Sequence, residues 1–231
     1  LQKIFPGGHV TMVGANSPSS LASRPIRILL ADEIDRYPAT AGNEGDPLLL
    51  AGKRLATFWN KKEVCVSTPT NKETSRIAVE FEHSTQEEWN VPCPACGAFT
   101  PLLWANIVFD RDKLDEIGCT CPACGVVSSE TEWKEQYING KFVAAHPERK
   151  VRGFHLNALA SLFVDWREIV EKFLTANEEK KKGNIELLKV WTNTEMGETW
   201  EEDGEQIETD DLYKRREKYN CEVPEEVLVL T

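Results

Sequence analysis

This chain of 231 residues lacks several features that would place it in a class at once. It has no secretory signal peptide and no apolar run of membrane-spanning length, so we expect no membrane association and a reducing compartment for its seven cysteines. It contains no low-complexity tract. It also contains no Gly-x-x-x-x-Gly-Lys-Ser/Thr sequence, so the lysine-bearing phosphate cradle of P-loop nucleotidases is missing.

Clustered basic charge is also scarce. The formal net charge is −11, from 38 acidic and 27 basic side chains. Residues 195–231 hold 13 of the acidic and 4 of the basic side chains, a net of −9, so everything before them carries about −2. Lys and Arg occur only in short groups typical of solvated surfaces, and composition alone therefore does not indicate a nucleic-acid-binding protein.

The most informative motif is an apolar run, residues 28–31, that ends in the adjacent carboxylates Asp32 and Glu33. This pattern is typical of the Walker B strand of P-loop ATPases. In that strand the first acid holds Mg²⁺, usually through water, and the second polarises the water that attacks the γ-phosphate. The alternative is an ordinary buried strand whose final acids only solvate a loop.

A second short strand is predicted at residues 63–66, ended by Ser67, Thr68 and Thr70. Residues 46–60 between the strands have helical spacing, with Asp46 as N-cap and Pro47 at the first position. This strand–helix–strand unit would bring Asp32, Glu33, Ser67 and Thr68 to one rim of an open sheet, where doubly wound folds bind ligands. An ordinary strand-to-loop turn is the alternative for residues 67–70.

Two near-identical Cys-Pro-Ala-Cys-Gly motifs contain Cys93 with Cys96 and Cys121 with Cys124. Two such turns can supply the closed four-sulfur tetrahedron of a structural zinc site, which leaves no open position for catalysis. Disulfides are the alternative in an oxidising compartment. Cys119 is an alternative ligand, although it lacks the glycine of the motif.

The rest of the chain is predicted to be largely helical. Asp165 and Glu168 resemble a capping box at the start of a helix that should run to about Lys182. A second helix is predicted at residues 185–193. His155 lies among apolar neighbours, which is more typical of a hydrogen-bonded core residue than of a catalytic one.

These patterns predict an α/β fold in three parts. Residues 1–90 would form the C-terminal part of an ATPase core, a partial P-loop NTPase-like parallel sheet with helices. Residues 91–127 would form a small zinc-ribbon-like module. Residues 128–231 would form a mixed and helical connector.

Several short motifs follow one another along nearly the whole chain. They are Phe5 to Gly8, Gly14 to Pro18, Ser23 to Pro25, Asp32 to Pro38, Ser67 to Thr70, Cys93 to Gly97, Gly153 to Asn157 and Asn193 to Trp200. Few of them are specific singly, but their combined order resembles that of the large terminase subunit of lambda-type (GpA) tailed phages.

The resemblance implies an ATP-driven motor and endonuclease that packages concatemeric viral DNA into procapsids and cuts it into genome lengths. By this resemblance Asp32 would organise the Mg²⁺ of Mg-ATP and Glu33 would be the catalytic carboxylate. Ser67, Thr68 and Thr70 would match the coupling motif that relays loss of the γ-phosphate to DNA-gripping elements.

The implied partners are double-stranded viral DNA, a small terminase subunit, a portal protein and further copies in a homo-oligomeric ring, all in the host cytoplasm. The resemblance further implies a P-loop upstream of Leu1 and a nuclease that begins just past residues 227–231. We therefore expect this segment alone neither to hydrolyse ATP efficiently nor to cut DNA.

Two other functions fit part of the sequence. Residues 32–35 also match the Asp-Glu-x-Asp box of superfamily-2 helicases, some of which carry zinc ribbons, although residues 67–70 fit the following Ser-Ala-Thr motif poorly. A zinc-ribbon adaptor without enzymatic activity is the second alternative, in which the Walker B likeness would be accidental.

Overall fold

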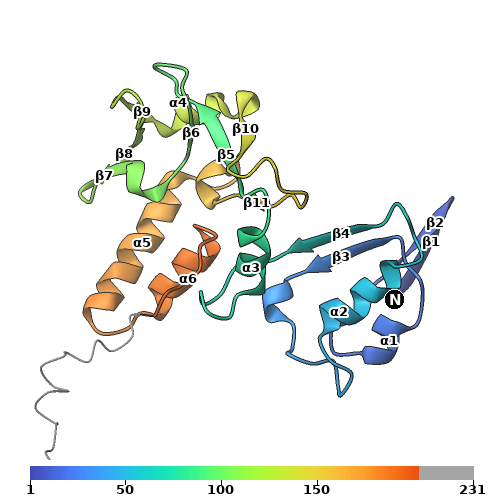
Figure 1. Ribbon diagram of the computed structural model, residues 1–231. Helices are drawn as coiled ribbons and strands as arrows, with labels where there is room; N and C mark the ends of the chain where they lie inside the picture. The colour runs from blue at the N-terminus through green and yellow to red at the C-terminus, as the bar shows by residue number, and fades with distance from the viewer. Residues whose placement is uncertain (203–231) are drawn as a thin grey trace, which may run out of the picture. The chain divides into compact units, whose positions relative to one another are not determined.

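The computed structural model describes residues 1–202, and residues 203–231 lie outside that description. Cys221 and residues 227–231, the stretch just past which the nuclease was expected to begin, are therefore among the undescribed residues. Residues Leu1–Trp200 form one compact unit. The unit contains both strands and helices, which confirms a mixed α/β fold (Figure 1).

The first part of the chain contains four strands and three short helices. In order they are β1 (Gln2–Phe5), β2 (Gly8–Thr11), α1 (Pro18–Ala22), β3 (Ile28–Asp32), α2 (Pro47–Gly52), β4 (Lys62–Val66) and α3 (Arg76–Glu82). Strands β1 and β2 form an antiparallel hairpin. Strands β3 and β4 pair in parallel, with Asp32 opposite Val66, so both strands end at the same edge as predicted.

Helix α2 begins as the sequence predicts but ends early. The Asp46 side chain accepts hydrogen bonds from the first-turn amides, and Pro47 occupies the first turn. The α-helix ends at Gly52 and continues only as a 3₁₀ turn, Lys53–Leu55. The prediction of one helix over residues 46–60 was therefore too long, since glycine is a poor helix former and the chain tightens there.

The second part of the chain is built from short hairpins followed by two longer helices. The elements are β5 (Glu87–Pro92), β6 (Phe99–Pro101), β7 (Ile107–Asp110), β8 (Lys113–Thr120), β9 (Val127–Ser129), α4 (Glu130–Glu135), β10 (Lys141–Ala144), β11 (Phe154–His155), α5 (Trp166–Lys181) and α6 (Glu186–Thr194). Single 3₁₀ turns occur at Ile34–Arg36, Trp104–Asn106, Tyr137–Asn139 and Ala158–Ala160.

Each cysteine motif lies in the turn of an antiparallel hairpin. Strands β5 and β6 flank the first motif, and β8 and β9 flank the second. Strand β5 also pairs with β10 and β11, and β8 also pairs with β7. The two hairpins thus bring the two motifs within reach of each other from different sheets.

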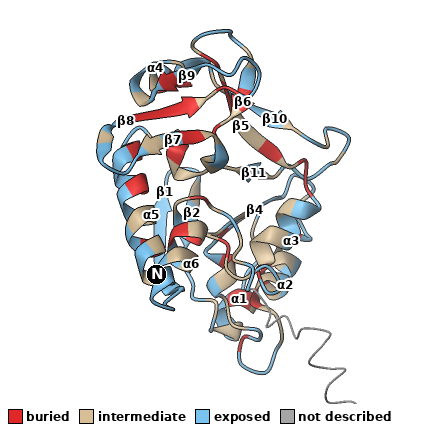
Figure 2. Ribbon diagram, turned by 90° about the vertical axis from the view of Figure 1, so that its left-hand side faces the viewer, coloured by how far each residue is buried: buried red, intermediate tan, exposed pale blue. Residues whose placement is uncertain are grey.

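The main hydrophobic core lies in this second part (Figure 2). Strands β5 and β8 and helices α4, α5 and α6 supply its buried side chains, with Trp133 and Trp166 completely buried. Trp104 packs against Trp191 and Phe173, with ring centroids 4.7 and 4.8 Å apart. Burying large side chains of this kind contributes about 1.5–3 kcal/mol each, so this core holds the hairpins and helices together.

Helix α5 occupies nearly the range that the sequence predicts, but its capping differs. Asp165 is the N-cap residue, yet its side chain makes no capping hydrogen bond, so the capping-box prediction for Asp165 and Glu168 was wrong. The amide of Trp166 instead donates to the Glu130 carboxylate of helix α4, at 2.9 Å. A tertiary contact therefore satisfies the helix end in place of a local one.

No helix among residues 1–202 has both the length and the apolar character that crossing a bilayer requires.

Candidate functional site

The acidic motif forms a tight turn at the end of β3. Asp32 is the last residue of the strand, and Glu33 follows it in a left-handed conformation, with φ 54° and ψ 48°. Both residues are exposed, whereas Ile34 directly after them is completely buried. The buried isoleucine anchors the turn, so two carboxylates are presented outward from a fixed point.

The carboxylate of Asp35 is the hydrogen-bonding centre of this site. Its Oδ2 accepts from both the amide and the hydroxyl of Thr70, each at 3.0 Å. Its Oδ1 accepts from the amide of Ile77 in the first turn of α3, at 2.8 Å. Asp35 therefore fixes the segment after β4 and the start of α3 to the turn after β3, and charge-assisted bonds of this kind are among the stronger ones.

Ser67 adds another connection between the two strand ends. The amide of Asp35 donates to Ser67 Oγ at 3.1 Å, and Ser67 Oγ donates to the carbonyl oxygen of Thr68 at 3.0 Å. The structure thus places Ser67 and Thr68 at the same edge as Asp32 and Glu33. The predicted sharing of one edge holds, and it depends on Asp35.

Two side chains beside the turn have raised pKa values. Burial, followed by the negative charges of Cys65 and Asp32, raises the pKa of Tyr37 above its ordinary value. Burial, followed by the charges of Glu63 and Glu80, raises the pKa of Cys65 to about 11. Both groups are therefore neutral near pH 7.

Thr70 is also held from its other side. Its carbonyl oxygen accepts from Asn193 Nδ2 at 3.0 Å and from the amide of Trp200 at 2.9 Å. Sequence reasoning assigned no role to Asp35 or Asn193. Asp35 could have been singled out because it belongs to the Asp-Glu-Ile-Asp motif, but nothing in the sequence connects Asn193 with Thr70.

The four cysteines of the two motifs converge. Cys93, Cys96, Cys121 and Cys124 have sulfur atoms that all lie within 4.8 Å of one another. The pairs Cys93–Cys124 and Cys96–Cys121 are 3.9 Å apart, close to the separation of about 3.8 Å that Zn–S bonds of about 2.3 Å give in a tetrahedron. A disulfide needs about 2.05 Å, so the alternative of disulfides does not describe these sulfurs.

The backbone of each motif is arranged to receive a cation. Gly97 and Gly125 adopt φ of +74° and +72°, a conformation that glycine adopts without strain. Their amides donate to the carbonyl oxygens of Cys93 and Cys121, and the amide of Ala95 points at Cys93 Sγ from 3.4 Å. The two turns are nearly the same structure, and together they can hold a metal ion with four thiolates.

Cys119 does not join this cluster. It is 1% exposed, packs in the hydrophobic core and donates from its sulfur to the Thr120 carbonyl oxygen. Burial raises the pKa of Cys119 to about 12. For Cys121, burial opposes ionisation, but hydrogen bonds from the backbone amides of Cys124 and Ala123 and from the sulfurs of Cys93 and Cys124 together lower its pKa to about 7. Burial raises the pKa of Cys93, and for Cys124 the backbone amide of Val126 lowers the pKa, but burial and the neighbouring sulfurs outweigh it and raise the pKa to about 12. Within the cluster, Cys121 is therefore the sulfur whose surroundings favour a thiolate.

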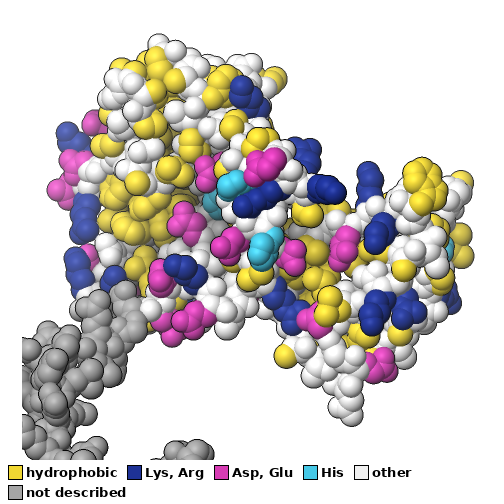
Figure 3. Space-filling view, in the orientation of Figure 1, with side chains coloured by type: hydrophobic (Ala, Val, Ile, Leu, Met, Phe, Trp, Pro, Cys, Tyr) yellow, Lys and Arg dark blue, Asp and Glu magenta, His cyan; other side chains and the backbone are white. Residues whose placement is uncertain are grey.

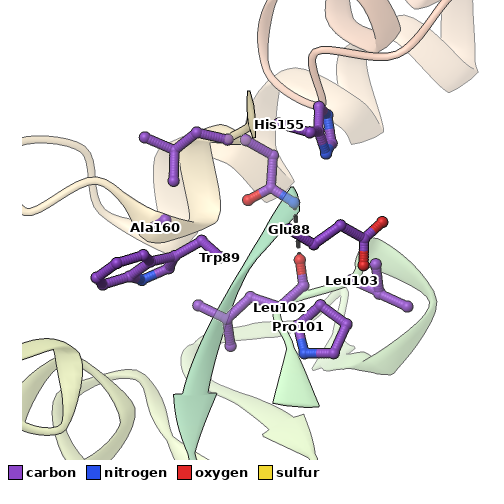
Figure 4. A pocket seen from close by; sticks show the side chains of 9 residues that line it. Glu88, Trp89, Pro101, Leu102, Leu103, His155 and Ala160 are labelled. Carbon is purple, nitrogen blue, oxygen red and sulfur yellow. Dashed lines mark hydrogen bonds between the residues drawn. The ribbon is translucent and has the colours of Figure 1, made fainter. Parts of the chain in front are cut away.

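His155 is a structural residue. Its Nε2 lies 3.0 Å from the Met196 carbonyl oxygen, and its ring lines a cavity of about 20 Å³ beside Glu88 and Trp89 (Figure 4). A cavity of that size holds about one water molecule and no organic substrate. The arrangement agrees with a hydrogen-bonded histidine.

Charged side chains of both signs are interleaved on the face that Figure 3 presents. Many of them pair: in the basic group at residues 180–182, for example, Lys181 Nζ lies 2.7 Å from Glu178 Oε1 and Lys182 Nζ lies 2.8 Å from Glu179 Oε1. Exposed pairs of this kind contribute little to stability. They agree with the expectation that the short basic groups are solvated surface.

Comparisons with known proteins define the class to which this arrangement belongs. The family model for the ATPase domain of the phage terminase large subunit gpA matches residues 1–142. The model for the endonuclease domain of the same subunit matches residues 151–231. The chain therefore belongs to the phage terminase large subunit gpA family.

Two curated relatives agree with this assignment. The large terminase subunit of Enterobacteria phage P21 is 24% identical over 257 residues, and that of Escherichia phage lambda is 25% identical over 258 residues. Both alignments cover 100% of this chain but 39% of the relative, so the chain spans about two fifths of the length of each. No solved structure matches the chain significantly.

The matched ranges also bear on the alternatives and on the position of the nuclease. Both family models and both relatives favour a terminase over a helicase or a zinc adaptor. The endonuclease model begins at residue 151, whereas we expected the nuclease to begin beyond residue 231. The cysteine cluster falls within the range of the ATPase model, and helices α5 and α6 fall within that of the endonuclease model.

Proposed function

We propose that this chain is part of a large terminase subunit, the ATP-driven motor and endonuclease that packages concatemeric viral DNA into procapsids and cuts it. The observation that carries the proposal is the Asp32–Glu33 turn at the shared end of two parallel strands, inside the range matched by the ATPase model. The endonuclease model over residues 151–231 supports the second activity.

In this proposal the two carboxylates have different tasks. Asp32, at the end of the strand, would help to organise the Mg²⁺ of Mg-ATP, and Glu33 would act on the attacking water. Ser67, Thr68 and Thr70 would form the coupling motif, which the bonds from Asp35 to Ser67 and Thr70 support.

We further propose that β3 and β4 belong to a larger P-loop NTPase-like sheet. The support is that both strands carry exposed apolar side chains, with Leu30 72% and Val66 55% exposed. Parallel strands are normally covered on both faces, so these side chains fit packing against other parts of the complete protein. Residues 1–90 would then be the C-terminal part of an ATPase core.

Residues 91–127 would be a zinc-ribbon-like module with a structural Zn²⁺ held by the four clustered cysteines. Two hairpins with a cysteine motif in each turn, four sulfurs within 4.8 Å and no fifth ligand among them support this assignment in the described residues. When bound, the ion would supply folding energy and no chemistry, because four thiolates close its coordination sphere. Residues 128–150 would connect this module to residues 151–231, the range that the endonuclease model matches, so the connector is shorter than the one expected over residues 128–231.

The partners follow from the proposed activity. They are double-stranded viral DNA, a small terminase subunit, a portal protein and further copies of the subunit in a ring, acting in the host cytoplasm.

The test is Glu33→Gln in the complete protein, with ATP turnover and bound zinc both measured. General-base groups contribute about 10²–10⁴-fold, so we expect turnover to fall by about 10²-fold or more with zinc retained. Glu44→Gln, a change at an exposed acid in the loop before α2, is the matched control and should leave turnover unchanged. Unchanged turnover in Glu33→Gln would remove Glu33 from the mechanism.

A further inference from the structure

Every backbone and side-chain polar group of Thr70 is occupied, and the partners come from two separate parts of the chain. The amide and hydroxyl bind one oxygen of Asp35, in the turn after β3. The carbonyl oxygen, with two lone pairs, accepts from both Asn193 Nδ2 and the amide of Trp200. Thr70 thus bridges the acidic turn and the segment from residue 193 to residue 200.

The contact on the Asn193 side is buried and fully used. Asn193 is 7% exposed, and its Nδ2 donates to Glu198 O at 2.8 Å as well as to Thr70 O. The contact continues along the backbone, since Asn71 and Trp200 form a parallel bridge and the amide of Lys72 donates to Trp200 O at 2.9 Å. Buried donors with two well-placed acceptors hold a segment firmly.

The contact on the Asp35 side leads directly to the carboxylates. Asp35 is two residues from Glu33, and Ile34 between them is completely buried. A change in the Glu33 turn therefore cannot be absorbed at Ile34 without disturbing its packing, and it would be passed to Asp35. From Asp35 the path divides, to Thr70 and to the first turn of α3 at Ile77.

We propose that Asp35, Thr70 and Asn193 form a relay that couples the acidic turn to residues 193–200, with Asp35 and Asn193 as positioning residues. The inference rests on the proposed function, which it deepens. The acidic turn lies in the range of the ATPase model and residues 193–200 in that of the endonuclease model. Through Thr70, the relay thus makes the DNA-dependent activity of the residues in the endonuclease range sensitive to ATP turnover at the acidic turn.

The principal experiment is Asn193→Asp in the complete protein. The substitution keeps the side-chain shape but replaces two N–H donors with an oxygen that faces the carbonyl oxygens of Thr70 and Glu198. We expect the DNA length packaged per ATP hydrolysed to fall about tenfold relative to wild type, since losing two buried hydrogen bonds and placing oxygen against oxygen costs about that factor, even though Thr70 O keeps the bond from the Trp200 amide. A ratio within twofold of wild type would overturn the relay.

Asn157→Asp is the matched control. Asn157 is a partly buried asparagine whose Nδ2 donates to the Leu102 carbonyl oxygen at 2.7 Å and makes no bond to Thr70. The same chemical change there should lower the melting temperature without changing the ratio of DNA packaged to ATP hydrolysed. An equal fall in both variants would assign the effect to general destabilisation and would overturn the proposal.

Substitutions at Thr70 test the relay without the risk of misfolding around residue 193. Thr70→Val removes the hydroxyl bond to Asp35 and keeps the shape and the backbone bonds, whereas Thr70→Ser keeps the hydroxyl. We expect Thr70→Val to lower the DNA length packaged per ATP hydrolysed, whereas Thr70→Ser should keep it near the wild-type value. In a double-mutant cycle Thr70→Val and Asn193→Asp should be non-additive, because both interrupt one path; additive effects would contradict a single relay.

The outcomes separate this inference from the proposed function. The relay alone is overturned if the wild-type protein hydrolyses ATP, the Glu33→Gln variant loses turnover, and every relay variant packages a normal length of DNA per ATP hydrolysed. A complete wild-type protein without ATP turnover overturns the proposed function, and the relay falls with it.

Discussion

Glu33 is held in an unfavourable backbone conformation at the site of the proposed chemistry. Among residues 1–202 it is one of two non-glycine residues with positive φ; the other is Gln86, with φ 49°. A left-handed conformation costs a residue with a Cβ about 1–2 kcal/mol. Strain of this kind concentrates where a side chain must point in a direction that relaxed backbone does not provide. At Glu33 the strained residue carries the second carboxylate of the turn, which is exposed.

We expect Glu33→Gly to stabilise the protein while abolishing ATP turnover. Glycine relieves about 1–2 kcal/mol of strain and costs about 0.5–1 kcal/mol in backbone freedom, so the net gain lies between about 0 and 1.5 kcal/mol. Urea unfolding of the wild-type and Glu33→Gly proteins measures this difference in the free energy of unfolding. Gln86→Gly is the matched control: it relieves similar strain away from the acids and should leave turnover intact. A loss of stability in Glu33→Gly would show that the glutamate side chain contributes more to folding than the strain costs.

The thiol of Cys65 on β4 should ionise at a higher pH than an ordinary cysteine thiol. Burial, followed by the charges of Glu63 and Glu80, raises its pKa from 9.0 to about 11. Since the thiolate is the reactive form, alkylation of Cys65 should accelerate up to about pH 11 and not level off near pH 9. Peptide mapping by mass spectrometry after timed alkylation measures this rate, and a plateau near pH 9 would contradict it.

The same shift has a consequence for stability. In the unfolded chain the thiol loses its proton near pH 9, whereas in the folded chain it keeps the proton to about pH 11. The folded pKa is the higher one, so the stabilising contribution is complete below about pH 9 and is lost as the pH rises toward 11. Cys65→Ala should therefore lose less stability than wild type over that interval.

At the scale of elements, the helices differ in how their ends are satisfied. Ser129 and Glu132 form a complete capping box at α4: the Ser129 amide donates to the Glu132 carboxylate at 2.7 Å, and Ser129 Oγ accepts from the Glu132 amide. Asp165 at α5 makes no such bond, and Glu130 caps that helix instead. Both N-cap residues fit the capping-box sequence pattern, but only Ser129 makes the side-chain hydrogen bonds that define a capping box.

Ser129→Ala should therefore cost about 1 kcal/mol of stability, the usual value of an N-cap side chain. Asp165→Ala, the matched substitution at an N-cap without a side-chain capping bond, should cost clearly less, since it removes only an exposed ion pair with Lys134 at 3.9 Å. Thermal unfolding of both variants provides the comparison. Equal losses would mean that Asp165 caps α5 in solution.

The four-cysteine cluster should control the stability of its own segment. Thiolate–zinc bonds can supply about 10 kcal/mol or more of folding energy to a segment too small for its own core. Chelation should then unfold residues 90–126 first, visible as new cleavage there in limited proteolysis. Absence of new cleavage in that range after zinc removal would contradict the idea.

A pair of cysteine variants sharpens this experiment. Cys124→Ser removes one sulfur of the cluster and should lower the zinc content and expose the same cleavage sites. Cys119→Ala changes a nearby buried cysteine whose sulfur lies outside the cluster, so it should retain zinc. A loss of zinc in Cys119→Ala would instead indicate that Cys119 is a zinc ligand.

At the scale of the whole molecule, the predictions that held depend on short stretches of sequence. The two cysteine motifs, the N-cap Asp46 and the paired ends of β3 and β4 each follow from a few neighbouring residues. The length of α2 failed because residues after Gly52 tighten into a 3₁₀ turn, which apolar spacing does not distinguish from an α-helix. The spacing of apolar residues indicates which face of a helix or strand is buried, but it predicts the last residue of the element poorly.

The parts of the site that sequence reasoning missed all join distant residues. Asp35 binds Thr70 and Ile77, and Thr70 binds Asn193, more than a hundred positions away. The sequence contains many carboxylates and amides of the same kinds, and their spacing does not say which of them meet. Those pairings depend on how β3, α3 and α6 pack.

The sequence by itself determined the local chemistry of this protein: two carboxylates at the end of an apolar strand, hydroxyl residues after the next strand, and two cysteine turns of a metal-binding type. Local chemistry can be read in this way because a turn, a cap or a cysteine motif is stabilised by residues within a few positions of one another. Only the tertiary structure decided that Cys119 stays outside the cysteine cluster, that Glu33 is strained, and that Thr70 lies between Asp35 and Asn193. These features arise from burial and packing between segments far apart in the chain, which is why no local pattern contains them.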